Sequence, residues 1–385
     1  MYELRHGMEG YPVKLLQYAL DRTGKDELAA DGIFGRRTAK ALLRFQREQG
    51  LSADAVAGKL TWAALYPYIS GYTVHKVIAG DTFEGIAKRY QTTVAALITA
   101  NPTLAHRQPT AGAILTIPMP FSTVMGNIPS SSLLMELMIK GLTMRYPFLT
   151  SCEIGRSVMG KRILSVSVGH GSRQIGYIAA HDAKSWIGTA VLLRFLEEYA
   201  AAVAADGTIG GFRARELYGS ATLHVVPQVN PDGVDLVNGA LDPFDSFYAQ
   251  AKAMAAYYPQ IPFPTGWKSN ILGVDLSLQY PTDWNSIRRT SFQQGIDRPG
   301  PVGFAGSEPL IAPENRAMAR WTGNHDLALT LSFDRGYANW FIHTWHRPAV
   351  TVDLENGAKG EVSPAFEEIY RTVLPILARH LAVNP

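Results

Sequence analysis

Beyond residue 131, short apolar runs alternate with longer stretches of helical periodicity, and this pattern limits the possible folds more than any other feature. The strand-like runs are 164–168, 176–180, 221–226, 327–331 and 349–354. The helical stretches include 188–204, 313–322 and 363–381. Apolar strands separated by helices are typical of an α/β domain with a mostly buried sheet, and we predict that fold class here.

Two smaller segments precede this region. In the first, we expect helices at 13–20 and 39–49, with Thr38 as the N-cap of the second helix and Gly50 just after its end, and a third near Thr61. The second segment predicts strand, helix, helix and strand in fewer than 50 residues. A linker at 119–131 is rich in proline, serine and glycine. We therefore predict a three-helix domain at 1–70, a βααβ domain at 72–118 and an α/β domain at 133–385.

Composition excludes several classes of protein. The 36 basic and 33 acidic residues leave a net charge of +3, which does not indicate a nucleic-acid partner. No apolar run approaches the length of a membrane span, and the first residues lack a signal-peptide core, so the export route is undetermined. The single cysteine, Cys152, excludes an intramolecular disulfide and a multi-thiolate zinc site. We expect Cys152 to be buried and unreactive.

The first segment carries an ordered set of motifs, namely Asp31-Gly32-Ile33-Phe34-Gly35-Arg36-Arg37-Thr38, Phe45-Gln46, Gly50-Leu51, Asp54, Gly58, Thr61-Trp62 and Leu65. This set resembles the peptidoglycan-binding domain of cell-wall hydrolases. Ala55 stands where that family prefers glycine. Most of these residues are expected to hold the three-helix fold, so the resemblance implies a binding function for the domain as a whole.

The second segment carries Lys76-Val77, Gly80-Asp81-Thr82, Ile86-Ala87, Tyr90, Leu97, Asn101-Pro102, Gly112 and Leu115-Thr116-Ile117-Pro118. It resembles a LysM domain, which binds N-acetylglucosamine chains. The resemblance implies that the loops present glycan-binding groups, at Gly80, Asp81, Thr82, Asn101 and Pro102. Two modules that bind one polymer raise each other's effective concentration.

The third segment carries Tyr146-Pro147, residues 154–161, Val229-Asn230-Pro231-Asp232-Gly233, Trp267-Lys268-Ser269-Asn270, Gly273-Val274-Asp275-Leu276 and Gln279-Tyr280-Pro281. From about residue 133 the chain resembles the zinc carboxypeptidase family, and within it the γ-D-glutamyl-L-diamino acid endopeptidases that cleave peptidoglycan stem peptides. The resemblance implies a mixed sheet flanked by helices. It also implies a zinc ion held by His, Glu and His with one open position.

The first two zinc ligands of the family lie in a His-x-x-Glu-Trp-Ile motif. With Trp186-Ile187 as the anchor, the ligand positions hold Asp182 and Ser185, and a neutral serine is a poor zinc ligand. A shift by one residue places His181 opposite Lys184, whose ammonium group would repel zinc. Neither alignment supplies two ligands of the expected kind.

Other positions of the family's chemistry also differ. Leu272 stands where the family has an arginine, and Ser277-Leu278 follow Gly-Val-Asp-Leu in place of asparagine. Near the third ligand the chain has Ser332-Phe333-Asp334, without histidine. The catalytic glutamate matches Asp353, whose carboxylate is one methylene shorter. Leu272, Leu278 and Phe333 are expected to make the cleft more apolar. The sequence does not decide whether these side chains fill the cleft or leave it open.

Four histidines and two serines are candidates for other sites. A metal cluster of His325, His343 and His346 is conceivable, but packing or surface roles fit their aromatic neighbours better. His224 lies in an apolar strand, where a hydrogen-bonded core position is expected. Ser157 and Ser185 lack the context of a nucleophile elbow, which argues against a serine hydrolase.

These observations predict a peptidoglycan-binding protein of the cell wall or spore envelope, whose peptidase-like domain is non-catalytic and requires no cofactor. Its expected partners are the glycan chains and stem peptides of peptidoglycan. The alternative is an active zinc-dependent stem-peptide peptidase with an altered site drawn from Asp182, His181, Asp353 and a further histidine. A third hypothesis is an envelope scaffold in which the large domain docks a partner protein.

Overall fold

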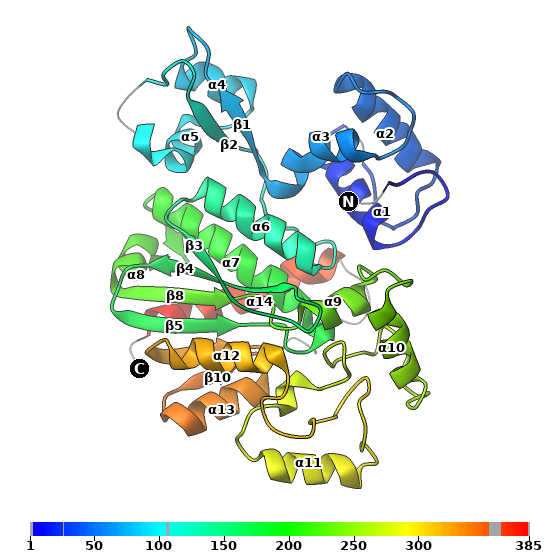
Figure 1. The fold of residues 1–385 in the computed structure, drawn as a ribbon. Helices are drawn as coiled ribbons and strands as arrows, with labels where there is room; N and C mark the ends of the chain where they lie inside the picture. Colours follow the sequence, from blue (N-terminus) through cyan, green and yellow to red (C-terminus); the bar gives the residue numbers. More distant parts are fainter. Residues whose placement is uncertain (1–2, 26, 105–107, 354–362, 384–385) are drawn as a thin grey trace. The chain divides into compact units, whose positions relative to one another are not determined.

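In a computed structural model, the chain forms two compact units (Figure 1). The structure describes residues 3–25, 27–104, 108–353 and 363–383. Unit 1 comprises Met1–Ile128 and Glu136–Phe148, and unit 2 comprises Pro129–Met135 and Leu149–Pro385. Helix α6 (Ser132–Arg145) contributes residues to both units. This division does not separate the small segments individually, so the boundaries near 70, 118 and 133 remain predictions.

The first segment of unit 1 contains the three expected helices, α1 (Tyr11–Asp21), α2 (Arg36–Glu48) and α3 (Lys59–Ser70). Gly50 has a positive φ of 66° just beyond α2, as predicted for a residue that ends a helix. The prediction that Thr38 caps α2 is wrong. The helix already begins at Arg36 after an extended Gly35, and the buried Thr38 hydroxyl accepts a hydrogen bond from Gln17 Nε2 at 3.0 Å.

Two buried glutamines make the same set of hydrogen bonds in two successive loops of this segment. Gln17 Nε2 contacts Asp31 Oδ1, Ile33 O and Thr38 Oγ1, and its Oε1 accepts from Gly32 N. Gln46 Nε2 contacts Asp54 Oδ1, Val56 O and Thr61 Oγ1, and its Oε1 accepts from Ala55 N. The domain therefore contains an internal repeat, in which an Asp-x-apolar turn wraps around a glutamine amide and leads into a helix.

The repeat explains why glycine is favoured at position 55. Gly32 has φ +83° at the equivalent place, and Ala55 adopts φ +58°. The left-handed region costs a residue with a Cβ about 1 kcal/mol or more. We expect Ala55→Gly to raise the free energy of unfolding by about 1 kcal/mol, measured by denaturant titration. Ala57→Gly, at a buried position outside this conformation, should instead be destabilising. A destabilising Ala55→Gly would contradict the assignment of strain.

The second segment of unit 1 has the predicted strand–helix–helix–strand order. Strands β1 (Tyr72–Lys76) and β2 (Ile114–Pro118) pair antiparallel, with α4 (Phe83–Arg89), α5 (Val94–Ala100) and the short η1 (Pro102–Leu104) between them. Apolar side chains of α4, α5 and β2, together with Val77 just after β1, form one small core, which includes Phe83, Ile86, Leu97 and Ile117. Periodic apolar residues were sufficient to predict this unit.

Unit 2 is built on a six-stranded mixed sheet in the order β10-β9-β5-β8-β4-β3. The strands β5 (Arg173–Ile178), β8 (Ala221–Val226), β9 (Leu327–Ser332) and β10 (Ala349–Thr351) are parallel. Strand β4 (Arg162–Gly169) pairs antiparallel with β8, and the edge strand β3 (Thr150–Arg156) pairs antiparallel with β4. A two-stranded hairpin, β6 (Thr208–Ile209) and β7 (Phe212–Arg213), stands apart. The α/β class and the mixed sheet are confirmed.

Helices cover both faces of this sheet (Figure 1). On one face, α12 (Pro313–Gly323) and α13 (Arg335–Trp345) supply Met318, Trp321 and Tyr337 to a core shared with Ile178 and Val226. On the other face, Tyr177 packs against Phe195 of α7 (Ile187–Ala204), and its hydroxyl donates to Leu377 O of α14 (Ser363–Ala382). The remaining helical elements are η2 (Ala183–Ser185), α8 (Ala214–Ser220), α9 (Pro231–Asn238), α10 (Ser246–Ala255), η3 (Leu276–Leu278) and α11 (Trp284–Gln293).

The structure differs from the sequence-based expectations at Cys152, at β3 and at the last predicted strand. Cys152 is exposed rather than buried, because it lies on β3, the edge strand with mostly exposed residues. The apolar pattern of the sequence does not predict β3. The last predicted strand ends at Thr351, and residue 354 lies outside the described residues. Among the helices that the structure describes, none has the length and hydropathy required to cross a membrane.

Candidate functional site

A cleft of about 470 Å³ opens at the carboxyl ends of β5, β9 and β10, three neighbouring parallel strands of unit 2. Ligands of open α/β sheets commonly bind at this edge. The lining contains Asp182, Ser185, Lys268, Ser277, Leu278, Ile287, Phe333, Asp334, Arg335, Gly336, Asn339, Thr351, Val352 and Asp353. The structure therefore brings together Asp182, Ser185 and Asp353, the three positions that sequence comparison selected as remnants of the peptidase site.

Asp182 follows β5 and begins the short η2 helix. Its Oδ1 accepts a hydrogen bond from Lys184 N at 2.8 Å, and its Oδ2 lies 3.2 Å from Lys268 Nζ. Burial raises the pKa of the Asp182 carboxyl, and Lys268 opposes that shift. The ammonium group of Lys268 thus lies beside the position where the family has its first zinc ligand. Ser185, at the end of η2, adds only a neutral hydroxyl.

Asp334 lies two residues after the end of β9, and both of its carboxylate oxygens accept hydrogen bonds. Its Oδ1 accepts from Tyr337 N as the N-cap of α13, and its Oδ2 accepts a hydrogen bond from Ser277 Oγ. Gly336 allows this arrangement, since a Cβ there would lie 1.8 Å from Ser277 O. The close approach of α13 to η3 closes one wall of the cleft, at the place where the third zinc ligand was sought.

Asp353 follows β10 and is half-exposed. Its Oδ2 lies 3.3 Å from an Arg335 guanidinium nitrogen. Both side chains are accessible to solvent, so this pair contributes little to stability. A carboxylate does stand at the cleft where the family base is expected, and its role as a base remains a prediction.

His181 lies outside the cleft lining, in the core of unit 2. Its Nε2 is 2.7 Å from Tyr280 Oη, and its ring packs against Tyr280 and Tyr337. Burial lowers the pKa of the imidazole, which favours the neutral form. The alignment that offered His181 as a zinc ligand is therefore not supported by its position.

The residues present do not fit the zinc ion that the family resemblance implies. Zinc is held by imidazole, thiolate or carboxylate groups. Of the two motif positions, the first holds Asp182, whose carboxylate is paired with Lys268, and the second holds Ser185, which offers only a hydroxyl group. Within residues 3–25, 27–104, 108–353 and 363–383, no three His, Cys, Asp or Glu side chains are grouped so that they could hold a metal ion.

The cleft is open, and apolar atoms form the larger part of its lining. Leu278 and Phe333 line the cleft as expected. The Phe333 ring also packs close to Gly188, where a Cβ would lie 3.3 Å from it. Leu272 does not line the cleft and is 40% exposed, so this third expected contribution is wrong. Lysine, arginine, aspartate, serine and asparagine side chains alternate with the apolar ones around the opening. This mixture suits a ligand that carries both charges and aliphatic carbon.

The other histidines take the structural roles that were favoured. His224 is buried between Ser167 Oγ at 2.8 Å and Gln174 Oε1 at 2.7 Å, and burial lowers its pKa to about 4. His325 contacts Trp321 with the two rings tilted, and it lies beside His224. His343 and His346 are exposed on and after α13. They do not form the metal cluster that was considered.

In the LysM-like segment, most side chains predicted to bind glycan are used within the fold. Asp81 accepts from Ile78 N and from His75 Nε2, and Thr82 caps α4 through Gly85 N. The Asn101 amide bonds to Leu97 O and to both backbone groups of Thr116. Contacts to a glycan through these loops would therefore fall to backbone groups, including those at Gly80 and Pro102. Glycan binding at these five residues remains a prediction.

Sequence reasoning did not assign two cations of the cleft. Lys268 was part of a recognised motif, Trp267-Lys268-Ser269-Asn270, and that motif was the available signal. Arg335 carried no comparable signal, because only the position of α13 beside β10 places it at the cleft.

Comparison with known families places this fold and cleft in a defined class. Residues 135–374 match the model of the zinc carboxypeptidases, which covers more than half of the chain. The chain belongs to the zinc carboxypeptidase family. Residues 9–65 match a putative peptidoglycan binding domain, and residues 75–118 match a LysM domain. These two domains imply association with the cell wall.

Similar proteins include two bacterial relatives. Gamma-D-glutamyl-L-diamino acid endopeptidase 1 of Lysinibacillus sphaericus is 34% identical over 279 residues, which are 62% of this chain and 68% of the relative. The uncharacterized protein YqgT of Bacillus subtilis (strain 168) is 28% identical over 292 residues, 64% of this chain and 75% of the relative. Among solved structures, the murein-tripeptide amidase MpaA of Escherichia coli O157 is similar with a TM-score of 0.34 and 18% identity, covering 61% of this chain and 92% of that one.

Proposed function

We propose that this protein is a peptidoglycan-binding protein of the cell wall or spore envelope, whose carboxypeptidase-like cleft holds stem peptides without cleaving them. The observation that carries the proposal is the pairing of Asp182 with Lys268 at 3.2 Å, next to the neutral Ser185. The Lys268 ammonium group lies beside Asp182 at the first ligand position, so the cleft retains charge for recognition while it lacks a ligand set for zinc.

The charges of the cleft complement a stem peptide. A γ-D-glutamyl-diamino acid unit carries carboxylates and an ammonium group on aliphatic chains. Lys268 and Arg335 would bind the carboxylates, Asp182 and Asp353 would bind the ammonium group, and Leu278 and Phe333 would contact the methylenes. The two N-terminal domains would hold the protein on the glycan and raise the local concentration of stem peptides.

The first test is the metal content of the purified full-length protein, dialysed against trace zinc and measured by elemental mass spectrometry. We expect far less than one zinc per chain, and binding of a γ-D-glutamyl-diaminopimelate peptide by calorimetry with no cleavage products. Lys268→Met should weaken peptide binding about tenfold. The matched control Lys252→Met, in the last turn of α10, should leave binding unchanged.

One zinc per chain, together with chelator-sensitive cleavage of the peptide, would overturn the proposal. That result would support the alternative of an active stem-peptide peptidase, which the 34% identity to an endopeptidase favours. A partner protein of the envelope remains a third hypothesis. It would be supported if the full-length protein retained a defined envelope protein but no peptidoglycan.

A further inference from the structure

Helix α2 of unit 1, labelled in Figure 1, carries its basic residues on one side. At about 3.6 residues per turn, five cations lie within about 100° of the helix circumference. They are Arg36, Arg37, Lys40, Arg44 and Arg47. Thr38, Leu42 and Phe45, on the opposite side of the helix, are buried. The cations therefore point away from the domain core, and we call these five residues the α2 basic face.

Most of this charge is not used within the protein. In the part of the chain that the structure describes, the ion pairs of α2 involve only Arg44 and Glu48. Arg44 donates to Lys25 O at 2.8 Å and lies 3.9 Å from Glu48 Oε1, which is itself 3.1 Å from Lys25 Nζ. The other four cations of the α2 basic face are exposed, so they are available to a ligand.

The fold of the domain does not require this charge. The two helices of the internal repeat, α2 and α3, align from the glycine that precedes each of them. Lys40 and Arg47 of α2 then correspond to Ala63 and Ser70 of α3. Only the first basic residue of α2 has a basic counterpart in α3. The repeat therefore shares its buried glutamine and its turn, whereas the basic face belongs to one copy alone.

Two of the cations also oppose the helix dipole. Arg36 and Arg37 stand in the first turn of α2, which contains no acidic residue. A cation near a helix N-terminus is unfavourable, because the positive end of the dipole lies there. Their two adjacent guanidinium groups also repel each other. A local cost without a structural gain indicates a surface that is kept for binding.

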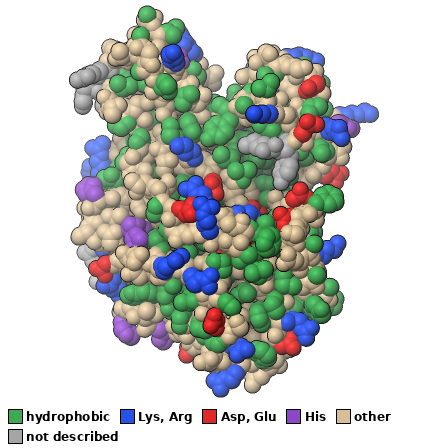
Figure 2. Space-filling model, viewed as in Figure 1, with side chains coloured by type: hydrophobic (Ala, Val, Ile, Leu, Met, Phe, Trp, Pro, Cys, Tyr) green, Lys and Arg blue, Asp and Glu red, His purple; other side chains and the backbone are tan. Residues whose placement is uncertain are grey.

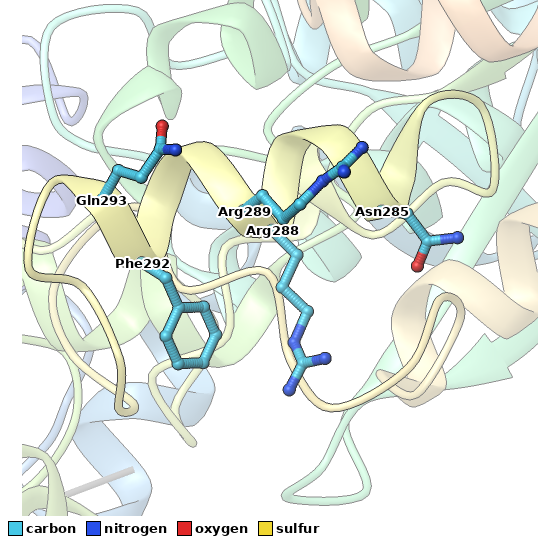
Figure 3. A pocket seen from close by; sticks show the side chains of 5 residues that line it. All are labelled: Asn285, Arg288, Arg289, Phe292 and Gln293. Atoms are coloured by element: carbon cyan, nitrogen blue, oxygen red, sulfur yellow. The ribbon is translucent and has the colours of Figure 1, made fainter.

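Basic side chains are more dispersed on other surfaces in the figures. Figure 2 shows them spread over the face turned to the viewer, several of them beside acidic side chains. On α11, Arg288 and Arg289 are adjacent in sequence, but Figure 3 shows that they point to different sides of the helix. The net charge of +3 gives the chain no general attraction for anions, so anion binding at α2 would depend on this local arrangement.

We propose that the α2 basic face binds peptidoglycan through the carboxylates of its stem peptides. Charge complementarity supports this ligand, because the glycan chains are uncharged and the stem peptides carry carboxylates that recur along each chain. From Arg36 to Arg47 the face spans about 16 Å at about 1.5 Å per residue, enough for more than one carboxylate. The face lies within residues 9–65, which match a putative peptidoglycan binding domain. This inference rests on the proposed function, because it takes peptidoglycan as the polymer.

The test is co-sedimentation of the full-length protein with insoluble peptidoglycan. Three probes are compared, namely peptidoglycan freed of phosphodiester polymers, the same material with its carboxylates amidated, and peptidoglycan that retains those polymers. Each exposed ion pair contributes about twofold to affinity, so the combined variant Arg36→Gln, Lys40→Gln and Arg47→Gln should bind the first probe about tenfold more weakly at low ionic strength. High salt should reduce this difference, because it screens exposed charges. The variant and the unaltered protein should bind the amidated probe equally.

The matched control removes the same charge from three separate helices of unit 2. It combines Lys252→Gln on α10, Arg289→Gln on α11 and Arg320→Gln on α12, all at exposed positions. We expect this protein to bind each probe as the unaltered protein does. Glutamine suits a helix about as well as lysine or arginine, so thermal unfolding of both variants should match that of the unaltered protein.

Equal binding of the α2 variant and the unaltered protein to the first probe would overturn the inference. The same loss on the amidated probe would also overturn it, because the lost contact would not involve carboxylates. A loss confined to the third probe would assign the face to phosphodiester polymers instead. A similar loss in the control variant would show an effect of overall charge rather than of this face. If the unaltered protein bound none of the probes, the proposed function itself would fail.

Discussion

Replacement of Asp235 by alanine is expected to lower the free energy of unfolding of unit 2 by about 3–5 kcal/mol. The carboxylate of this buried residue on α9 accepts three hydrogen bonds, from Ser132 N at 2.7 Å, Ser132 Oγ at 2.5 Å and Lys161 Nζ at 2.8 Å. Burial opposes the charge of Lys161, and the carboxylates of Asp235 and Asp232 hold its pKa above the usual value. Without Asp235, a largely buried ammonium group keeps only the 3.4 Å contact to Asp232.

Denaturant titration followed by tryptophan fluorescence would measure this loss. The matched control is Asp245→Ala, which removes an aspartate that caps α10 through Phe247 N and forms no ion pair with any of the residues that the structure describes. That variant should lose only about 1 kcal/mol. Similar losses for the two variants would show that the Asp235 network contributes no more than an ordinary helix cap.

Glu314→Gln is expected to remove a pH dependence of stability. Glu314 is fully buried at the start of α12, where it accepts from Val158 N at 3.2 Å and Asn270 Nδ2 at 3.3 Å, and burial raises its pKa to about 7. Above its ordinary pKa of 4.5 the unfolded chain releases this proton while the folded chain retains it. The native protein therefore loses stability as pH rises from about 4.5 to 7.

The two proteins should diverge as pH rises. Relative to the unaltered protein, Glu314→Gln should gain about 2–3 kcal/mol in free energy of unfolding between pH 5 and pH 8. Burial raises the pKa of Asp275 to about 6, so this residue adds a smaller pH dependence of stability, which is the same in both proteins. Glu308→Gln, at an exposed loop position, should follow the unaltered protein at each pH. A constant difference between Glu314→Gln and the unaltered protein would contradict the raised pKa.

Local pattern was sufficient for elements that carry their own signal. The runs at 221–226 and 327–331 correspond to β8 and β9 because continuous apolar sequence suits strands covered on both faces. Pattern failed at β3, whose Cys152 faces solvent at a sheet edge, and at the start of α2, where Gly35 rather than Thr38 precedes the helix. In both places a neighbouring element, rather than local propensity, decided the outcome.

The sequence by itself determined the class of each domain and showed that imidazole and glutamate are missing from the zinc motif, because motifs are local in the chain. Only the tertiary structure brought Asp182, Asp334 and Asp353 to one cleft, since they follow strands that are adjacent in the sheet and far apart in sequence. It also paired Asp182 with Lys268 at the first ligand position. Charge pairing depends on distances of a few ångströms, and those distances are set by packing between elements.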